Sequence, residues 1–272
     1  EGKISEIQEK QLSTFTGNVR ALKVKGTFDD CQKLVKTAFT DDELRGKLRL
    51  SSANSINISR LLPQSFYYFN AYARMKKLGL ADELVICVPS GNFGNITAGL
   101  FAKKMGLPIK RFIAANNAND IFYNYLKTGV YSPKPSVQTI ANAMDVGDPS
   151  NFARILDLYG KDHDAIASEI TGTTYSDMQI AETIAEVFSR TDYLCDPHGA
   201  CGYRALSENL REGETGVFLE TAHPAKFKDT VEGIIKTEVE IPEKLAAFMK
   251  GEKKSVSCSK EFADFKAFLL TR

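Results

Sequence analysis

The segment from residue 85 to residue 100 constrains the fold more than any other part of the 272-residue chain. An apolar run at 85–88 leads into the glycine-punctuated loop 90–95, which is followed by a segment of helical character. Glycines at 91 and 94 permit positive φ angles and close backbone approach, so several N–H groups can converge at the positive end of that helix. The segment predicts an α/β unit with an anion site, such as a phosphate site. A purely structural strand-to-helix turn is the alternative.

The rest of the chain repeats this alternation of strands and helices. Short apolar runs predict strands at 19–24, 48–50, 109–115, 193–195 and 216–221. Helical spacing and capping residues predict helices at 27–39, 58–77, 96–105, 176–189 and 203–210, and two amphipathic pieces joined by an extended link after Pro242. Strands joined through helices run parallel with right-handed crossovers. The expected fold class is therefore α/β, with parallel sheets flanked by helices.

Composition narrows the possible partners. The formal net charge is +1, with 35 basic and 34 acidic residues, which argues against nucleic acid as the main partner. No apolar stretch of about 18 residues and no secretory signal is evident, so we expect no membrane partner and a cytoplasmic location. The five cysteines are odd in number and scattered, which favours reduced thiols. Cys195, His198 and Cys201 lack a fourth ligand nearby, and no metal site is expected.

The glycine loop does not fit the two best-known phosphate motifs. It lacks the G-K-[ST] ending of a P-loop, so an NTPase is not indicated. It also lacks the G-x-G-x-x-G spacing and the later acidic residue of a dinucleotide-binding unit.

Five motifs in order resemble threonine synthase. They are S-A-N-S-I-N at 52–57 followed by Arg60, S-G-N-F-G-N at 90–95, A-M-D-V at 143–146, D-P-H at 196–198 followed by Y-R-A-L, and T-A-H-P-A-K-F at 221–227. The resemblance covers nearly the whole chain. It implies a pyridoxal-phosphate enzyme of fold type II, like the tryptophan synthase β subunit. Such an enzyme is a carbon–oxygen lyase that converts O-phospho-L-homoserine and water into L-threonine and phosphate.

The resemblance also assigns site residues. It gives the phosphate of pyridoxal 5'-phosphate to Ser90, Gly91, Asn92, Phe93, Gly94 and Asn95, and it places the Thr221 hydroxyl beside the pyridine nitrogen. It places three residues of the 52–57 motif, Asn54, Ser55 and Asn57, on the substrate side. Our candidate for the substrate phosphate is Arg154, with a surface helix cation as the equal alternative.

One part of the family pattern is missing. The P-T-x-A-F-K-D segment carries the lysine that forms a Schiff base with the cofactor, and it belongs N-terminal to all five motifs. Lys228 in F-K-D follows the C-terminal motif and is not expected to replace it. We therefore expect a C-terminal part of such an enzyme, with no catalytic residue of its own and no activity alone. The alternative is a non-catalytic phosphate- or cofactor-binding relative.

The same resemblance predicts the domain organisation. Residues 1–55 are expected to be the remainder of a small α/β domain, and residues 56–272 the C-terminal part of a large cofactor-binding domain. Surfaces left uncovered by a missing N-terminal part are expected to favour self-association.

Overall fold

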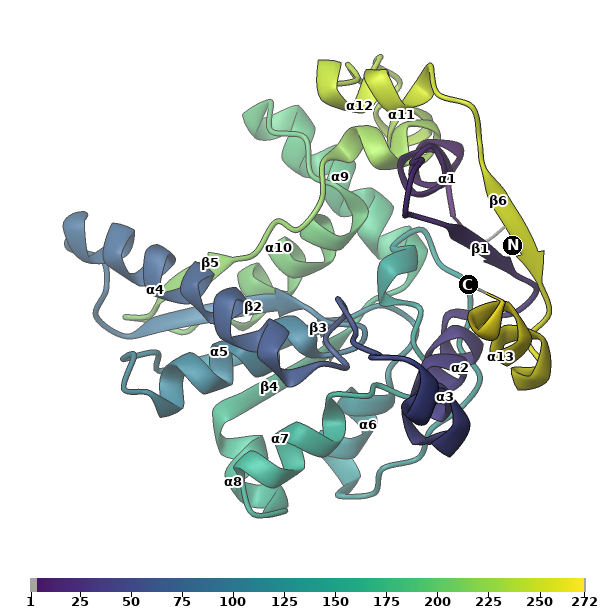
Figure 1. The fold of residues 1–272 in the computed structure, drawn as a ribbon. Helices are drawn as coiled ribbons and strands as arrows, with labels where there is room; N and C mark the ends of the chain where they lie inside the picture. The colour runs from purple at the N-terminus through teal and green to yellow at the C-terminus, as the bar shows by residue number, and fades with distance from the viewer. Residues whose placement is uncertain (1–3, 272) are drawn as a thin grey trace. The chain divides into compact units, whose positions relative to one another are not determined.

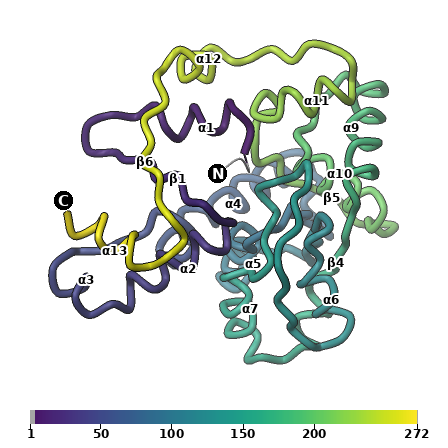
Figure 2. Tube along the Cα trace, turned by 90° about the vertical axis from the view of Figure 1, so that its right-hand side faces the viewer, coloured from purple at the N-terminus to yellow at the C-terminus, as the bar shows by residue number. Residues whose placement is uncertain are grey.

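The structure is a computed structural model that describes residues 4–271, and these form two compact units. One unit comprises residues 4–51, 224–232 and 236–271, and the other comprises residues 52–223 and 233–235. This division differs from the predicted one, which placed everything after residue 55 in one domain. The reason is a long-range ladder, because β6 (Ser255–Cys258) pairs in parallel with β1 (Ala21–Val24), as Figure 1 and Figure 2 show.

The larger unit contains a four-stranded sheet in the order β4-β3-β2-β5 (Figure 1). Its strands are β2 (Leu84–Pro89), β3 (Arg111–Asn116), β4 (Ile170–Thr174) and β5 (Thr215–Phe218). Every neighbouring pair is parallel, as expected for strands that are joined through helices. The predicted architecture of parallel sheets flanked by helices is confirmed.

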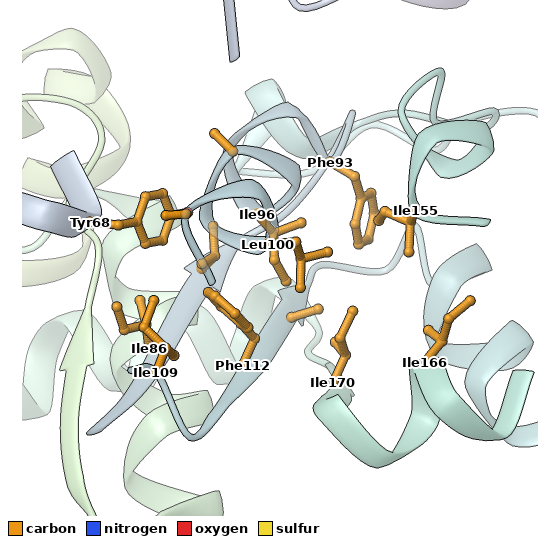
Figure 3. Close-up of a cluster of buried hydrophobic side chains, with 14 of the residues drawn as sticks. Tyr68, Ile86, Phe93, Ile96, Leu100, Ile109, Phe112, Ile155, Ile166 and Ile170 are labelled. Atoms are coloured by element: carbon orange, nitrogen blue, oxygen red, sulfur yellow. The ribbon is translucent and has the colours of Figure 1, made fainter. Parts of the chain in front are cut away.

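Helices cover both faces of this sheet, which explains why β2 and β3 are buried along their whole length and are apolar except for Arg111 and Asn116 at the two ends of β3. On one face, Ile86 and Phe112 belong to a cluster that includes residues of α4 (Leu61–Lys77) and α5 (Gly94–Lys104), shown in Figure 3. On the other face, α10 (Pro197–Asn209) contacts β2, β3 and β5. The thiol of Cys87 points to this second face and donates to the Gly202 carbonyl at 3.2 Å.

Local signals placed several other helices correctly. Thr27 and Ser176 form capping boxes at the starts of α2 (Phe28–Thr40) and α9 (Asp177–Thr191). The remaining helices are α1 (Glu6–Ser13), α3 (Asp42–Lys47), α6 (Ile121–Thr128), α7 (Phe152–Leu158), α8 (His163–Glu169), α11 (Lys228–Ile235), α12 (Glu243–Met249) and α13 (Phe262–Leu270).

Four expectations were wrong in detail. Residues 48–50 and 193–195 form no strand, because these short apolar runs find no partner strand. Helix α10 begins at Pro197, six residues before the predicted start, because Asp196 caps it. Strand β5 ends at Phe218, three residues before the predicted end, and is half-buried because it lies at an edge of the sheet. No helix among residues 4–271 is long and apolar enough to cross a membrane.

Helix α4 buries only some of its apolar residues, among them Leu61. Leu62 and Phe66 are more than half exposed, whereas Tyr68 is fully buried. The Tyr68 hydroxyl donates to the Asn95 carbonyl at 2.8 Å, and a Cβ at Gly99 would lie 2.5 Å from the Tyr68 ring. The glycine therefore allows α4 to approach α5, and through Asn95 the Tyr68 hydroxyl supports the glycine loop.

Candidate functional site

The glycine loop 90–95 connects the end of β2 to the start of α5, as predicted. Its first residue is firmly held, since the Ser90 N–H donates to the Ala115 carbonyl at 2.8 Å and the Asn116 side chain donates to the Ser90 carbonyl at 2.9 Å. Both partners belong to β3, the neighbouring parallel strand. The loop therefore leaves the sheet at the carboxyl ends of two adjacent strands, where open α/β sheets bind ligands.

Close approach, and not a positive φ angle, explains the two loop glycines. A Cβ on Gly91 would lie 2.6 Å from Met144 Cα, and one on Gly94 would lie 2.7 Å from Ser55 Cβ. Neither glycine has a positive φ angle. The expectation of close backbone approach therefore holds for these glycines, and the expectation of positive φ angles was wrong. The left-handed residue is Phe93, with φ of 60°.

Burial of the Phe93 ring offsets the strain of this backbone conformation. A left-handed conformation costs an L-residue about 1–2 kcal/mol. The Phe93 side chain is 2% exposed and packs against Phe122 with a ring-centroid distance of 4.5 Å. Burying a phenylalanine side chain contributes about 1.5–3 kcal/mol. The ring thus fixes the loop and turns the following backbone toward the cavity described next.

The loop borders a cavity of about 380 Å³. Within the described part of the chain, the backbone N–H groups of Gly91 to Asn95 donate to no other residue, and no side chain caps α5. Unpaired donors at the N-terminus of a helix attract an anion. The lining residues of the cavity are Ala53, Asn54, Ser55, Arg60, Gln64, Pro89, Ser90, Gly91, Asn92, Phe93, Gly94, Asn95, Ala143, Met144, His198 and Thr221.

The turn from residue 52 to residue 60 forms a second wall of this cavity. Asn54 and Ser55 line it, and the Ser55 hydroxyl accepts hydrogen bonds from Asn92 at 3.2 Å and from Asn151 at 3.0 Å. Asn57 lies outside the lining and stabilises the turn itself, because its side chain accepts from the Ser59 N–H and donates to the Ser52 carbonyl, both at 3.1 Å.

Arg154 lies outside the lining and braces this turn. Its guanidinium donates to the carbonyls of Ser55 at 3.0 Å and Ile56 at 2.6 Å, and to the Asn151 side chain at 2.6 Å. Burial lowers its pKa. The donors that we assigned to a substrate phosphate are therefore used within the protein, and Arg154 acts as a positioning residue for Ser55.

We expect Arg154→Ala to lower the free energy of unfolding by about 2 kcal/mol, because the Ser55 and Ile56 carbonyls lose charge-assisted hydrogen bonds. Urea denaturation measures this. Arg190→Ala is the control, since Arg190 is 59% exposed in its ion pair with Glu186 and such pairs contribute about 0–1 kcal/mol. Equal losses in the two variants would contradict the bracing role.

The segment 139–146 forms a third wall and is held by buried polar side chains. The Asp145 carboxylate accepts from the Thr139 hydroxyl at 2.7 Å, from Asn117 at 2.8 Å and from Asn119 at 3.2 Å. Burial raises the pKa of Asp145, and the bonds from Thr139 act in the opposite direction. These bonds hold the backbone around Met144 against Gly91.

His198 joins this wall to the start of α10. The Ala143 N–H donates to His198 Nε2 at 3.1 Å, so the ring proton must be on Nδ1, which lies 2.5 Å from Asp196 Oδ1. The same carboxylate oxygen accepts the His198 N–H at 2.9 Å and caps α10. His198 is therefore a neutral, oriented side chain that lines the cavity.

The structure brings most of the predicted site residues to one cavity. All six loop residues, Thr221, Asn54 and Ser55 line it, and Asn57 and Arg154 do not. Arg60, Gln64 and His198 line it as well, although we had assigned them no role. Arg60 and His198 stand within quoted motifs, and their position at helix starts was the available signal.

Lys228 and Cys201, which were also considered from the sequence, lie outside the cavity lining. The Lys228 ammonium binds the Glu232 carboxylate and the Val239 carbonyl within the first unit. The Cys201 thiol donates to the Asn116 carbonyl at 3.4 Å. Among the described residues, no group of three histidine, cysteine or acidic side chains is placed to hold a metal ion.

Comparison with family models identifies two matches. Residues 2–221 match the family described as pyridoxal-phosphate dependent enzyme, and residues 199–269 match the description threonine synthase, C-terminal. The first match includes the whole cavity lining.

Individual relatives agree with these family matches. The chain is 48% identical over 269 residues to threonine synthase from Haemophilus influenzae, which covers 99% of the chain and 63% of the relative. It superimposes on the crystal structure of threonine synthase from Escherichia coli with a TM-score of 0.92 and 44% identity, covering 100% of this chain and 63% of the other.

A third relative was solved with its cofactor. The pyridoxal-phosphate-bound threonine synthase from Brucella melitensis matches with a TM-score of 0.83 and 36% identity, covering 99% of this chain and 63% of the other. These structural matches confirm the fold class expected from the motifs. The chain spans about 63% of the length of each of these relatives.

Proposed function

Because the chain belongs to the family of pyridoxal-phosphate-dependent enzymes, we propose that its cavity binds pyridoxal phosphate as part of a threonine synthase. One observation carries this proposal: the unpaired N–H groups of Gly91 to Asn95 lie at the positive end of α5 on the cavity wall. They suit a phosphate group, because backbone donors at a helix start bind oxyanions without a cationic side chain.

Residues on the other walls suit the remainder of the cofactor. The Thr221 hydroxyl follows the end of β5 and lines the cavity, and we assign it to the pyridine nitrogen. A hydroxyl there holds that nitrogen less firmly protonated than a carboxylate would. When bound, pyridoxal phosphate supplies a ring that stabilises negative charge on a carbon next to an amino group.

The substrate phosphate is assigned to Arg60, in place of our earlier candidate Arg154. Arg60 is the only cationic side chain among the described lining residues, and it lies beside Asn54 and Ser55 in the same wall. A guanidinium binds phosphate through two parallel donors, and the side-chain amide and hydroxyl of these neighbours add further polar contacts. The three residues would orient O-phospho-L-homoserine for conversion to L-threonine and phosphate.

The chain by itself is proposed to be inactive. The lining residues among those described include no lysine, so the cavity offers no amine to bond the cofactor covalently. The Lys228 ammonium is already paired with Glu232 and the Val239 carbonyl. Cofactor held only by the loop would bind weakly and reversibly.

We expect Arg60→Gln to weaken binding of O-phospho-L-homoserine at least tenfold, which corresponds to about 1.4 kcal/mol. Isothermal titration of the pyridoxal-phosphate-loaded protein measures this, and the affinity for pyridoxal phosphate should change little. Arg49→Gln, which removes an exposed arginine, is the matched control. Unchanged substrate affinity in Arg60→Gln would refute the assignment of the substrate phosphate.

The activity is tested with the protein encoded by the complete gene. Release of threonine and phosphate from O-phospho-L-homoserine, dependent on added pyridoxal phosphate, would support the proposal. Cofactor binding without turnover would support the alternative, a non-catalytic cofactor-binding relative. Absence of cofactor binding would refute both.

A further inference from the structure

A buried carboxyl group, of Asp196, meets a partly buried one, of Glu220, beside the cavity, and neither has a role in the function proposed above. Asp196 is fully buried at the start of α10, and Glu220 follows the end of β5, directly before Thr221. The Asp196 N–H donates to Glu220 Oε1 at 3.0 Å, and the two carboxyl groups also interact with each other.

Each carboxyl group has one oxygen without a donor. Asp196 Oδ1 accepts from the His198 N–H and faces His198 Nδ1, but Asp196 Oδ2 and Glu220 Oε2 are buried atoms with no hydrogen-bond partner among residues 4–271. Two ionised carboxylates can only accept hydrogen bonds. A single proton on one of them supplies the missing donor and removes the repulsion between two buried negative charges.

The Glu220 carboxyl group occupies the space that the missing side chain of Gly199 leaves open. A Cβ at Gly199 would lie 1.6 Å from Glu220 Oε2 and 2.5 Å from Oε1. Any other residue at position 199 would displace the carboxyl group from the first turn of α10.

We propose that Glu220 is protonated at neutral pH and donates to Asp196 Oδ2, and that this proton positions two walls of the cavity. Through Asp196 and His198 it holds the Ala143 N–H and the wall at 139–146. Through the backbone it holds Thr221, the next residue in the chain. Glu220 is thus a positioning residue that lies outside the cavity lining and acts through its neighbours.

The electrostatic surroundings agree with this arrangement. Burial first, and then the charge of Asp196, raises the pKa of Glu220 to about 8. The titratable groups that face Glu220 are Tyr193, Cys195 and Asp196 on the preceding segment, with His198 behind Asp196. None of the groups that act on its charge among the described residues is a cation.

The pH dependence follows from the direction of this shift. The folded protein holds the Glu220 proton more tightly than the unfolded chain does, so the proton stabilises the fold fully below pH 4.5. That contribution declines as the pH rises and is lost above about pH 8. Above that value two buried carboxylates would repel each other, and the contact between Ala143 and His198 would loosen.

Infrared spectroscopy of the 272-residue chain tests the protonation directly and does not depend on the proposed function. We expect a protonated-carboxyl band near neutral pH that is absent from Glu220→Gln, whose amide can still donate to Asp196. Asp196→Asn should lower the pH at which the band disappears, because Glu220 then loses its charged neighbour but stays away from water. Glu212→Gln, which removes an exposed carboxylate before the other end of β5, should retain the band. A wild-type spectrum that equals that of Glu220→Gln would overturn the proposal.

Amide hydrogen exchange tests the positioning role. In the wild-type protein, the protection of the Ala143 N–H should fall at least tenfold as the pH rises through about 8, after correction for intrinsic exchange. In Glu220→Gln it should stay constant over the same range. A similar loss of protection in both proteins would show that the pair does not position this wall.

Discussion

Gly91→Ala is expected to abolish most of the phosphate affinity of the cavity. The added Cβ would lie 2.6 Å from Met144 Cα and 2.9 Å from the Ala143 carbonyl oxygen, and both are backbone atoms. The opposing wall cannot give way easily, because Asp145 and His198 hold it through hydrogen bonds. The loop must therefore move, and its N–H groups lose their common direction.

Inorganic phosphate binding, measured by isothermal titration, should weaken at least tenfold in Gly91→Ala. The free energy of unfolding should fall by about 1–3 kcal/mol, the usual cost of overpacking. Gly233→Ala is the matched control: no atom lies within 4 Å of its added Cβ, and alanine favours the helix α11 by up to about 1 kcal/mol. Wild-type phosphate affinity in Gly91→Ala would show that the loop is not the anion site.

The second large effect is expected at a buried ion pair at the amino ends of the strands. Glu214 accepts from Arg111 Nε at 2.9 Å and Nη2 at 2.5 Å, and the Arg111 side chain is 6% exposed. Glu214→Gln leaves the guanidinium buried without its counter-charge. Removing one partner of a buried pair costs about 3–5 kcal/mol. We expect the free energy of unfolding to fall by an amount near the lower limit, because the glutamine side chain still has one oxygen that can accept a hydrogen bond.

Acid unfolding provides an independent test of the same pair. The hydrogen bonds from Arg111 lower the pKa of Glu214 from 4.5 to about 2. The stability from this lowered pKa is present above pH 4.5 and is lost as the pH falls toward 2. Urea unfolding at several pH values should show that acid lowers the free energy of unfolding less in Glu214→Gln than in wild type. The exposed control Glu212→Gln should lose as much unfolding free energy in acid as wild type does. Equal acid dependence in Glu214→Gln and wild type would contradict the account.

Elements with strong local signals were predictable from the sequence. Strands β2 and β3 each contain a continuous apolar run, and α2 and α9 begin at capping boxes that need only four residues. The strands predicted at 48–50 and 193–195 failed because a strand exists only where a partner supplies its hydrogen bonds.

In the candidate site, the loop has a strong local sequence signal, whereas its walls depend on contacts between distant residues. The spacing of Gly91 and Gly94 predicted the loop that we assign to an anion, because a strand, a glycine loop and a helix follow one another in the chain. The roles of Arg154 and Arg60 could not be separated in this way. Both are cations near polar turns, and only the folded structure shows that one guanidinium is paired with backbone carbonyls whereas the other lines the cavity.

The sequence by itself determined the α/β fold class and the strand–loop–helix unit at 85–100, because strands, loops and helices depend on interactions within a few neighbouring residues. The order of the five motifs could also be read directly from the sequence. Tertiary structure alone decided the pairing of β1 with β6, the bracing by Arg154 and the meeting of Asp196 with Glu220. These contacts join residues separated by 24 to more than 200 positions. They form only when the packing of the whole unit has offset the entropy of closing the intervening chain. The glycine loop was thus visible in the sequence, whereas the contacts that hold its surrounding walls together were not.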